Sequence, residues 1–319
     1  MQNKVDICPL NRRAFIGRGT LILAGAATAS LDFHNCFADT IKNTNTENVL
    51  RIALVTDVHY ADKKTVGSRF YKESIAKIQT AAKEFKKQPI DFIVELGDLI
   101  DTARNMETDK KHLRLIDAEL KKISANRYYV LGNHCVETLT KEEFLDVIGQ
   151  QKSYFSFDQR GYHFVVLDAN FRQDGVAYGR NNADWKDTKI PDAEIKWIKS
   201  DLSSTKLPTI IFLHQRLDIG NQEACAVKNS DKIRQIFEES GKVQLVLQGH
   251  HHSGGYSEIN GIFYVTLLAL IEGTGEKNNS FSTLEICPNG NFRLTGFLRQ
   301  KSREIKTVAH QPHIVLKLF

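Results

Sequence analysis

Short apolar runs alternate with helix-like segments from residue 50 onward, and this alternation constrains the fold more than any other feature of the sequence. The run at 52–55 precedes a predicted helix over 68–87. The run at 90–96 precedes a charged helix over 107–123, which leads to a strand at 128–131. This order is the strand–helix–strand repeat of an α/β domain.

The second half of the chain is richer in predicted strands than the first. A hairpin is predicted from 154–157 and 162–168, and a helix begins at Pro191. Further apolar runs of strand length are found at 210–213, 243–247, 262–267, 280–286 and 292–298. An α/β beginning and a β-meander end predict a layered domain in which sheets face each other under helices.

The composition is that of a folded globular chain. Hydrophobic residues make up 41% and charged residues 25% of the 319 residues, which excludes long disordered, collagen-like or coiled-coil regions. The formal net charge is +5, and it falls to +3 without residues 1–38, which hold four basic and two acidic side chains. So small an excess excludes an extended basic surface for duplex nucleic acid or for an anionic membrane.

The first forty residues have the pattern of an export signal. Arg12 and Arg13 precede Phe15 and an apolar run at 21–29, which is too short to span a bilayer. The pattern resembles a twin-arginine signal, for which we expect cleavage after Ala38, transient contact with the export machinery and a periplasmic or secreted product. An uncleaved membrane anchor is the alternative. The chain then divides into a signal over 1–38, a linker over 39–49 and a folded domain over 50–319.

Three cysteines remain once the predicted leader is removed, namely Cys135, Cys225 and Cys287. They are widely spaced and form neither a disulfide framework nor a Cys-x-x-Cys zinc site, although one bridge could form in an oxidising compartment. We therefore expect each to be a small buried hydrophobic residue.

Residues that can bind metals follow the predicted strands, each set just beyond the end of its strand. In chain order they are Asp57 and His59, Asp98, Asn133 and His134, His214, and His250, His251 and His252. Ligands of open α/β sheets collect at the carboxyl ends of the strands. Oxygen and imidazole donors without a thiolate suit Mn, Fe, Zn or Ni better than calcium or a cysteine-rich zinc site.

Such a donor set has a clear use on phosphoesters. Their negative oxygens repel hydroxide, whereas two cations ~3.5–4 Å apart can bind those oxygens, bridge a water and lower its pKa. If Asp57 and His59 alternate on an extended segment, both side chains project to one side and can reach one ion. The glycines before Asp98, Asn133 and His250 permit sharp turns and close backbone approach. Each motif alone is commonly a cap or a turn, so the prediction depends on their ordered combination.

Together these motifs resemble the calcineurin-like metallophosphoesterase superfamily, from about residue 50 to the end of the chain. The resemblance is carried by Asp57-x-His59, Gly97-Asp98, Gly132-Asn133-His134, His214 and Gly249-His250-x-His252. It implies an α/β fold, a four-layer α/β-β/α sandwich of two mixed sheets flanked by helices, with a dinuclear centre. One metal would be held by Asp57, His59, Asp98 and His252, and the other by Asp98, Asn133, His214 and His250, with Asp98 bridging.

Two positions depart from the family pattern. Many members have an acidic residue after Gly-Asn-His, where this chain has Cys135, so carboxylate support for His134 from that position is absent. Asp101 stands where the purple acid phosphatase branch has a tyrosine ligand, so no iron–tyrosinate centre is expected. His251 is the variable residue of the last motif and is not expected to be a ligand.

His134 is predicted to act in the chemistry rather than in metal binding. If Asn133 points at a metal, the next side chain points toward the open face where the substrate lies. A protonated imidazole there can donate to the leaving oxygen or stabilise the phosphoryl oxygens. The alternative is that His134 supports Asp57 or a loop carbonyl.

A long polar segment at 170–189 follows the strand that ends at Asp168. Long loops without periodicity often act as lids over a site, and disorder is the competing interpretation. Within it, Arg172, Tyr178, Arg180 and Trp185 could contact a phosphate and a base or sugar.

The resulting hypothesis is an exported phosphoesterase with two divalent or trivalent metal ions, in which a metal-bridged hydroxide attacks a phosphate mono- or diester. Its substrate would be a small phosphorylated molecule. A cyclic-nucleotide or nucleoside-diphosphate phosphodiesterase, of the ADP-ribose or CDP-alcohol kind, is the alternative within this chemistry. A non-catalytic scaffold would be expected to have lost ligands, and a metallo-β-lactamase-like hydrolase would need a His-x-His-x-Asp-His cluster that is absent.

Overall fold

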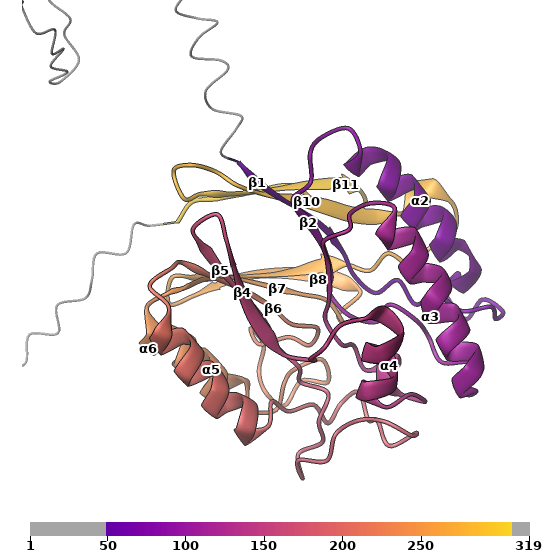
Figure 1. The fold of residues 1–319 in the computed structure, drawn as a ribbon, viewed down its shortest axis with the longest axis horizontal. Helices are drawn as coiled ribbons and strands as arrows, with labels where there is room; N and C mark the ends of the chain where they lie inside the picture. The colour runs from indigo at the N-terminus through magenta and orange to yellow at the C-terminus, as the bar shows by residue number, and fades with distance from the viewer. Residues whose placement is uncertain (1–48, 308–319) are drawn as a thin grey trace, which may run out of the picture. The chain divides into compact units, whose positions relative to one another are not determined.

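Two mixed sheets of six strands each face each other in the computed structural model, which describes residues 49–307 (Figure 1). The first sheet, in the order β12-β11-β10-β1-β2-β3, consists of β1 (Leu50–Val55), β2 (Phe92–Glu95), β3 (Arg127–Tyr129), β10 (Ser280–Ile286), β11 (Phe292–Leu298) and β12 (Arg303–Ile305). The second sheet, in the order β4-β5-β6-β7-β9-β8, consists of β4 (Phe155–Gln159), β5 (Tyr162–Val166), β6 (Thr209–Phe212), β7 (Val243–Gln248), β8 (Ser253–Ile259) and β9 (Ile262–Leu268).

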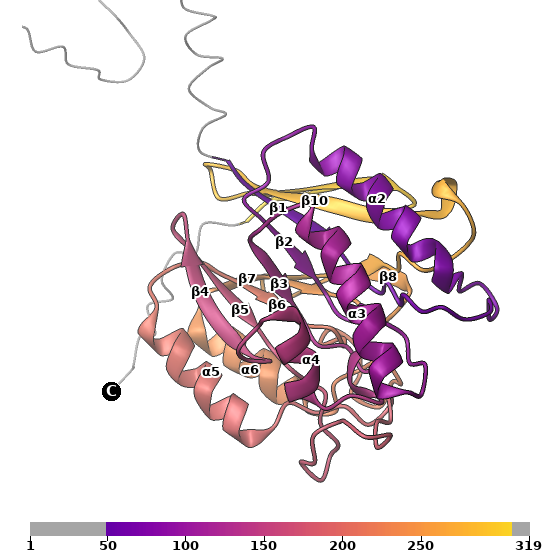
Figure 2. The same ribbon diagram turned by 45° about the vertical axis from the view of Figure 1, so that its right-hand side comes forward.

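Helices cover the outer face of each sheet and complete four layers (Figure 1, Figure 2). The first sheet is covered by α2 (Ser74–Phe85), α3 (Met106–Lys121) and α4 (Lys141–Ile148), and the second by α5 (Asp192–Ser204) and α6 (Ser230–Ser240). Single 3₁₀ turns are η1 (Tyr71–Glu73), η2 (His134–Val136) and η3 (Glu276–Asn278). The arrangement confirms the predicted α/β-β/α sandwich.

This layering explains why the apolar run of β1 is continuous. Ile52 and Leu54 pack between the two sheets, whereas Ala53 and Val55 pack under the helices. Because successive side chains of a strand point to opposite faces, a strand buried on both faces must be apolar at every position. The same reasoning applies to the apolar part of β6, where Ile210 and Phe212 pack between the sheets and Ile211 packs under the helices.

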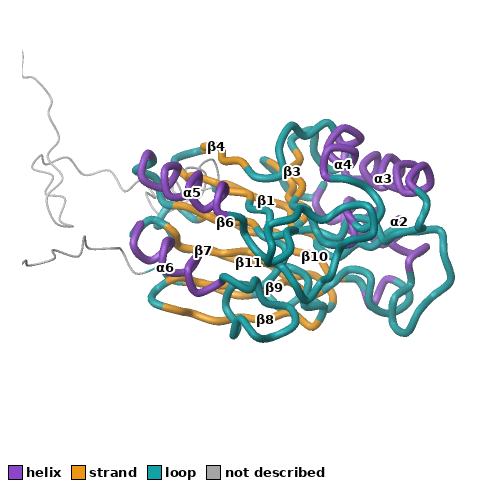
Figure 3. The backbone as a smooth tube through the Cα atoms, turned by 90° about the horizontal axis from the view of Figure 1, so that it is seen from below, coloured by secondary structure: helices purple, strands orange, loops and turns teal. Residues whose placement is uncertain are grey.

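The strands that precede the metal-binding motifs all end at one edge of the sandwich. β1, β2 and β3 are parallel in the first sheet, and β5, β6, β7 and β9 are parallel in the second. The Leu270 amide beyond β9 donates to the Thr56 carbonyl beyond β1 at 3.1 Å, which ties the two sheets together there. Figure 3 looks onto the molecule from this side, where loops cover the middle of the sandwich.

Four elements were not predicted, namely α4, α6, β8 and β12. A capping box begins α4, since the Thr140 hydroxyl accepts from the Glu143 amide at 3.3 Å and the Glu143 carboxylate accepts from the Thr140 amide at 2.9 Å. This Thr-x-x-Glu signal is legible in the sequence. β8 contains two glycines and is half exposed, so it lacks the apolar pattern of the other strands.

The predicted export signal over 1–38 lies outside the described residues, as does all but the last residue of the predicted linker. Within residues 49–307, no helix is long and apolar enough to cross a membrane. Cys135, Cys225 and Cys287 are all free thiols; Cys135 is buried as expected, whereas the other two are half-buried.

Candidate dinuclear metal centre

The turns beyond the strands hold four of the predicted site residues in the left-handed backbone region. The φ angles are 51° at Asp57, 46° at His59, 60° at Asp98 and 66° at His250. Residues other than glycine adopt such angles at a cost of about 1–3 kcal/mol each, which only a well-braced local structure tolerates. The prediction of an extended segment at Asp57 and His59 was therefore wrong, although both side chains still reach the same site.

Hydrogen bonds and close contacts between the turns supply that bracing. The Asp57 amide donates to the Gly97 carbonyl at 2.9 Å, and the His59 amide donates to the Asp98 carbonyl at 2.8 Å. A Cβ on Gly97 would lie 2.3 Å from the His214 ring, and one on Gly132 would lie 2.2 Å from the Asp98 carboxylate. As predicted, these glycines allow a backbone approach that any side chain would prevent.

The first group of donors consists of Asp57, His59 and His252, whose ligand atoms lie within 4.8 Å of one another. The two Nε2 atoms of His59 and His252 are 3.2 Å apart, and His252 Nε2 is 3.4 Å from Asp57 Oδ1. Each imidazole is held from behind by a carboxylate. Asp101 lies 3.2 Å from Nδ1 of His59, and Glu272 lies 2.5 Å from Nδ1 of His252. Carboxylates in this position fix the ring and make Nε2 a better ligand.

The second group consists of Asp98, His214 and His250. Nε2 of His214 is 3.1 Å from Asp98 Oδ2, and its Nδ1 donates to the Leu96 carbonyl at 2.8 Å. That hydrogen bond leaves Nε2 as the atom that can bind a metal. Asn133 lines the same cavity as Asp98 and His250.

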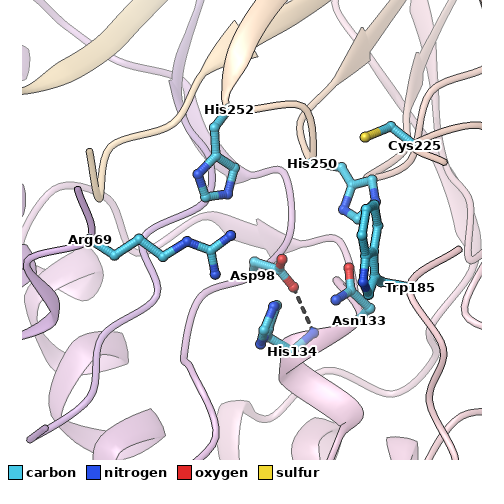
Figure 4. A pocket seen from close by; sticks show the side chains of 8 residues that line it. All are labelled: Arg69, Asp98, Asn133, His134, Trp185, Cys225, His250 and His252. Carbon is cyan, nitrogen blue, oxygen red and sulfur yellow. Dashed lines mark hydrogen bonds between the residues drawn. The ribbon is translucent and has the colours of Figure 1, made fainter. Parts of the chain in front are cut away.

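Asp98 lies between the two groups. Its Oδ2 is 3.5 Å from Nε2 of His59 in the first group and 3.1 Å from Nε2 of His214 in the second. Its Oδ1 accepts a hydrogen bond from the His134 amide at 2.8 Å (Figure 4). One carboxylate is therefore placed to serve both groups.

The charges in the site are strongly coupled. Burial alone would raise the pKa of Asp57, but His252 and His59 lower it well below its ordinary range. Burial is likewise outweighed at Asp98, where His214, His134 and His59 lower the carboxyl pKa. Asp57 and Glu272 outweigh burial at His252 and raise its pKa to about 9, whereas burial beside His214 lowers the pKa of His250 to about 3.

Several buried donor atoms of the site have no hydrogen-bond partner within the described residues. These atoms are Asp57 Oδ1, Asn133 Oδ1, His134 Nδ1, His214 Nε2 and His250 Nε2. Leaving a buried polar atom unpaired costs about 1–3 kcal/mol, so five in one place indicate that a bound group completes them. A mixed carboxylate, amide and imidazole set fits a transition-metal ion, and the two groups around Asp98 fit two such ions.

His134 begins η2 and faces the cavity, with its side chain 23% exposed. Its Nδ1 lies 3.4 Å from Glu137 and 3.7 Å from Asp101. Burial opposes protonation, but Asp98 and Glu137 together raise the His134 pKa. Glu137, two residues after Cys135, thus provides the carboxylate beside His134 that many family members have at the position of Cys135. Cys135 itself packs into the core under the helices.

The segment at 170–189 folds back on its own atoms, and this revises our expectation for three of its residues. The Tyr178 side chain is buried, with its hydroxyl donating to the carbonyls of residues 184 and 187. Arg180 pairs with Glu143 through two hydrogen bonds of 2.7 Å, and Arg172 pairs with Asp174 at 2.8 Å. These side chains brace the loop, and none of them lines the cavity.

The cavity over the donor groups has a volume of about 480 Å³. Its lining consists of Arg69, Asp98, Asn133, His134, Trp185, Cys225, His250 and His252 (Figure 4). Arg69 and Cys225 carry no sequence signal of a site residue. Glu272 was missed as well, although it follows a predicted strand in the way that the other donors do.

The sequence and the fold both match known proteins. Residues 50–254 match the family model described as calcineurin-like phosphoesterase. The chain is 23% identical over 303 residues to a manganese-dependent ADP-ribose/CDP-alcohol diphosphatase of Arabidopsis thaliana, with 79% of this chain and 96% of the relative covered. A protein of the same name from Danio rerio is 22% identical, with 74% and 91% covered.

Two solved structures have the same fold. A dimetal phosphatase from Danio rerio superposes with a TM-score of 0.69 at 19% identity, covering 81% of this chain and 99% of that structure. A purple acid phosphatase from yellow lupin superposes with a TM-score of 0.54 at 15% identity, covering 80% of this chain and 53% of that one.

Proposed function

The chain belongs to the calcineurin-like phosphoesterase family, and we propose that it hydrolyses nucleoside diphosphate esters with two metal ions. The observation that carries the proposal is the convergence of two groups of donors, which include buried unpaired atoms of Asp57, His214 and His250, on one carboxylate, Asp98. Bound there, two cations supply binding for phosphate oxygens and lower the pKa of the attacking water.

The proposed ligands divide as the two groups do. The first ion would be held by Asp57, His59, His252 and Asp98, and the second by Asp98, Asn133, His214 and His250. Asp101 and Glu272 support this division, because they hold the rings of the first group with Nε2 directed into the site.

We propose that His134 donates a proton to the leaving oxygen. It lines the cavity, its amide is fixed on Asp98, and the nearby carboxylates favour its protonated form. A group in that place and state can neutralise the charge that develops as the bond to phosphorus breaks.

Two features favour a diphosphate over a simple monoester as the substrate. Two curated relatives matched along most of their length are named as ADP-ribose/CDP-alcohol diphosphatases. In addition, the cavity holds a guanidinium, that of Arg69, beside the donor groups, where it can bind a second phosphate. Arg69 is one-third exposed and lies 3.9 Å from its nearest carboxylate, Asp101, so it remains available to a ligand.

A substrate panel with Mn²⁺ tests this proposal. ADP-ribose and a CDP-alcohol should have the highest kcat/KM, above AMP, a 2′,3′-cyclic nucleotide and bis(p-nitrophenyl) phosphate. Asp98→Asn, purified in parallel, should remove activity toward all of them and so control for contaminating phosphatases. A higher kcat/KM for the monoester or the cyclic nucleotide would replace the diphosphate proposal with one of its alternatives, and no turnover of any ester would favour the scaffold.

We also propose export through a twin-arginine pathway, on the basis of Arg12, Arg13 and Phe15, which lie outside the described residues. A pathway that carries folded proteins would allow metal to be loaded before export. Replacing both arginines with lysine should retain the precursor inside the cell. Unchanged accumulation outside the cytoplasm would contradict this route and leave ordinary secretion or an anchor.

A further inference from the structure

The two walls of the cavity differ in chemistry. Arg69 lies on one side of Asp98 and Trp185 lies on the other, with His252 above Asp98 and His250 beside Trp185 (Figure 4). One wall is therefore cationic and the other aromatic, so a substrate with two unlike ends has a preferred direction in the site.

The cationic wall also contains the proposed proton donor. Arg69 and His134 both face the carboxylate of Asp101, at 3.9 and 3.7 Å. The backbone of Arg69 forms an isolated antiparallel β-bridge with Glu272, and the Glu272 carboxylate contacts Nδ1 of His252. A guanidinium on this side of the centre is suited to a leaving phosphate, because that group gains charge as it departs.

The aromatic wall is held on a braced loop. Trp185 is 43% exposed. His250 lies against its ring, with centroids 5.8 Å apart and planes at 63°, and Nζ of Lys186 lies 5.1 Å from the centroid of the indole. Its loop is fixed by the Tyr178 hydroxyl on the carbonyl of Asp187 at 2.9 Å and by the two hydrogen bonds between Arg180 and Glu143. An exposed indole on a braced loop offers a ready stacking surface, since little flexibility is lost when a flat ring binds it.

Within the cavity lining, Trp185 is the one side chain with a six-membered aromatic ring. A nucleobase at the opposite wall would meet the guanidinium of Arg69, where no six-membered aromatic ring lines the cavity. Base stacking on an aromatic side chain contributes about 1–3 kcal/mol, so the two directions of binding are not equivalent.

We infer that the nucleoside stacks on Trp185 and that water attacks the phosphorus that carries it, an inference that rests on the proposed diphosphate hydrolysis. The water oxygen bonds to the nucleoside-bearing phosphorus and releases one proton to solvent. The bond from that phosphorus to the bridging oxygen breaks. The bridging oxygen leaves with the second phosphate, on the side of Arg69, and takes a proton from His134. The products are a nucleoside monophosphate and a phosphomonoester of the other alcohol.

Hydrolysis of ADP-ribose in ¹⁸O-labelled water shows which of the two phosphorus atoms is attacked. The label should appear in the phosphate group of AMP and not in the phosphate group of ribose 5-phosphate, because the water oxygen stays on the attacked phosphorus. Label in the phosphate of ribose 5-phosphate, or divided between the two phosphates, would overturn the inference while leaving the diphosphatase activity intact. An enzyme that cleaves no nucleoside diphosphate would contradict the proposed function, and the direction of attack would fall with it.

The stacking surface can be tested without turnover. The chain has two tryptophans, so Trp197→Phe leaves Trp185 as its only indole. Trp197 lies in α5, packs against the core under that helix and does not line the cavity. In that variant, with Mg²⁺ or Zn²⁺ in place of paramagnetic Mn²⁺, AMP should quench the fluorescence and ribose 5-phosphate should not. Equal responses to the two phosphates would overturn the assignment of Trp185.

Substitution of the indole gives a matched pair of variants. Trp185→Ala should raise KM for ADP-ribose about 10-fold or more, whereas Trp185→Phe, which keeps an aromatic face, should stay within about threefold. An equal rise in both variants would show that the loop, and not a stacking face, matters at this position.

Discussion

Histidines in two regions of the molecule are held in different ways, and the difference separates a structural histidine from a ligand. At His163 on β5, both ring nitrogens are paired, Nδ1 with Asp158 at 2.6 Å and Nε2 with Asp201 at 2.8 Å. In the metal centre, Nδ1 of His214 donates to a carbonyl, whereas its Nε2 lies 3.1 Å from Asp98 Oδ2 and has no hydrogen-bond partner within residues 49–307. A ring with both nitrogens held by carboxylates has nothing left to offer an ion, whereas a ring that is held at Nδ1 and directs Nε2 toward other donors is prepared for one.

The two regions also differ in their remaining polar groups. Asp201 beside His163 has a further partner, the Ser156 hydroxyl at 2.7 Å. The centre instead leaves Asp57 Oδ1 and Asn133 Oδ1 buried and unpaired, and it places Asp98 at positive φ. Unpaired donors and backbone strain concentrated in one region indicate that stability there has been given up for function.

The largest effect is expected when the shared carboxylate is neutralised. Asp98→Asn should remove measurable activity toward every ester and release at least one metal, because both donor groups depend on this charge. Asp201→Asn is the matched control, since it neutralises a carboxylate that holds a fully paired histidine. Elemental analysis and initial rates measure metal content and activity in both variants. Near-normal turnover of Asp98→Asn with both metals retained would contradict the role of Asp98 in both donor groups.

His134 provides a third case beside the structural His163 and the proposed ligand His214, because it lies in the metal centre and is not assigned as a ligand. His134→Ala should keep both metals and lower kcat by ~10²–10⁴-fold for substrates with a poor leaving group. The loss should be smaller for a p-nitrophenyl ester, whose leaving group needs no proton. Loss of metal in proportion to activity, or equal losses on both esters, would assign His134 to support of the centre instead.

A smaller effect is expected at the carboxylate behind His252. Glu272→Gln keeps the size of the side chain but removes the charge that orients the ring, so metal affinity of the first donor group should fall about 10–100-fold. Glu276→Gln, an exposed position of the same loop that contacts Thr80, should leave affinity unchanged. Titration of the metal-free protein with Mn²⁺ measures both, and equal affinities in the two variants would mean that Glu272 does not act on the centre.

The smallest effect concerns stability at His163. Asp201 and Asp158 outweigh burial and raise the His163 pKa, so its stabilisation is complete below the unfolded value of about 6.5 and is lost as pH rises through the folded value. His163→Gln should therefore lower the free energy of unfolding by about 1 kcal/mol at pH 5–6 and by less at higher pH, with kcat unchanged. A destabilisation that grows with pH would contradict this sign.

The fold and the donor set could be predicted because both depend on local pattern. Strands buried on both faces require unbroken apolar runs, and parallel strands bring the residues beyond their ends to one edge. Asp57, Asp98 and His214 were accordingly placed together from the sequence. The Thr-x-x-Glu capping box at Thr140 also predicts the start of a helix. The prediction therefore omitted α4 although the sequence contains a signal for it.

The aromatic wall of the cavity could not be predicted from the sequence, because it depends on how the segment at 170–189 folds back on itself. Tyr178 and Arg180 have the chemistry of binding residues, but the loop uses them as braces, and only Trp185 is left facing the cavity. The left-handed backbone at Asp57 and His59 was also beyond the sequence, since residues other than glycine give no local sign of positive φ.

Anomalous diffraction from crystals grown with Mn²⁺ tests the dinuclear centre most directly. The geometry predicts two peaks per chain, ~3.5–4 Å apart, with Asp98 between them, His59 and His252 on one side and His214 and His250 on the other. A single peak, or peaks that Asp98 does not join, in crystals of protein that hydrolyses phosphoesters would contradict it.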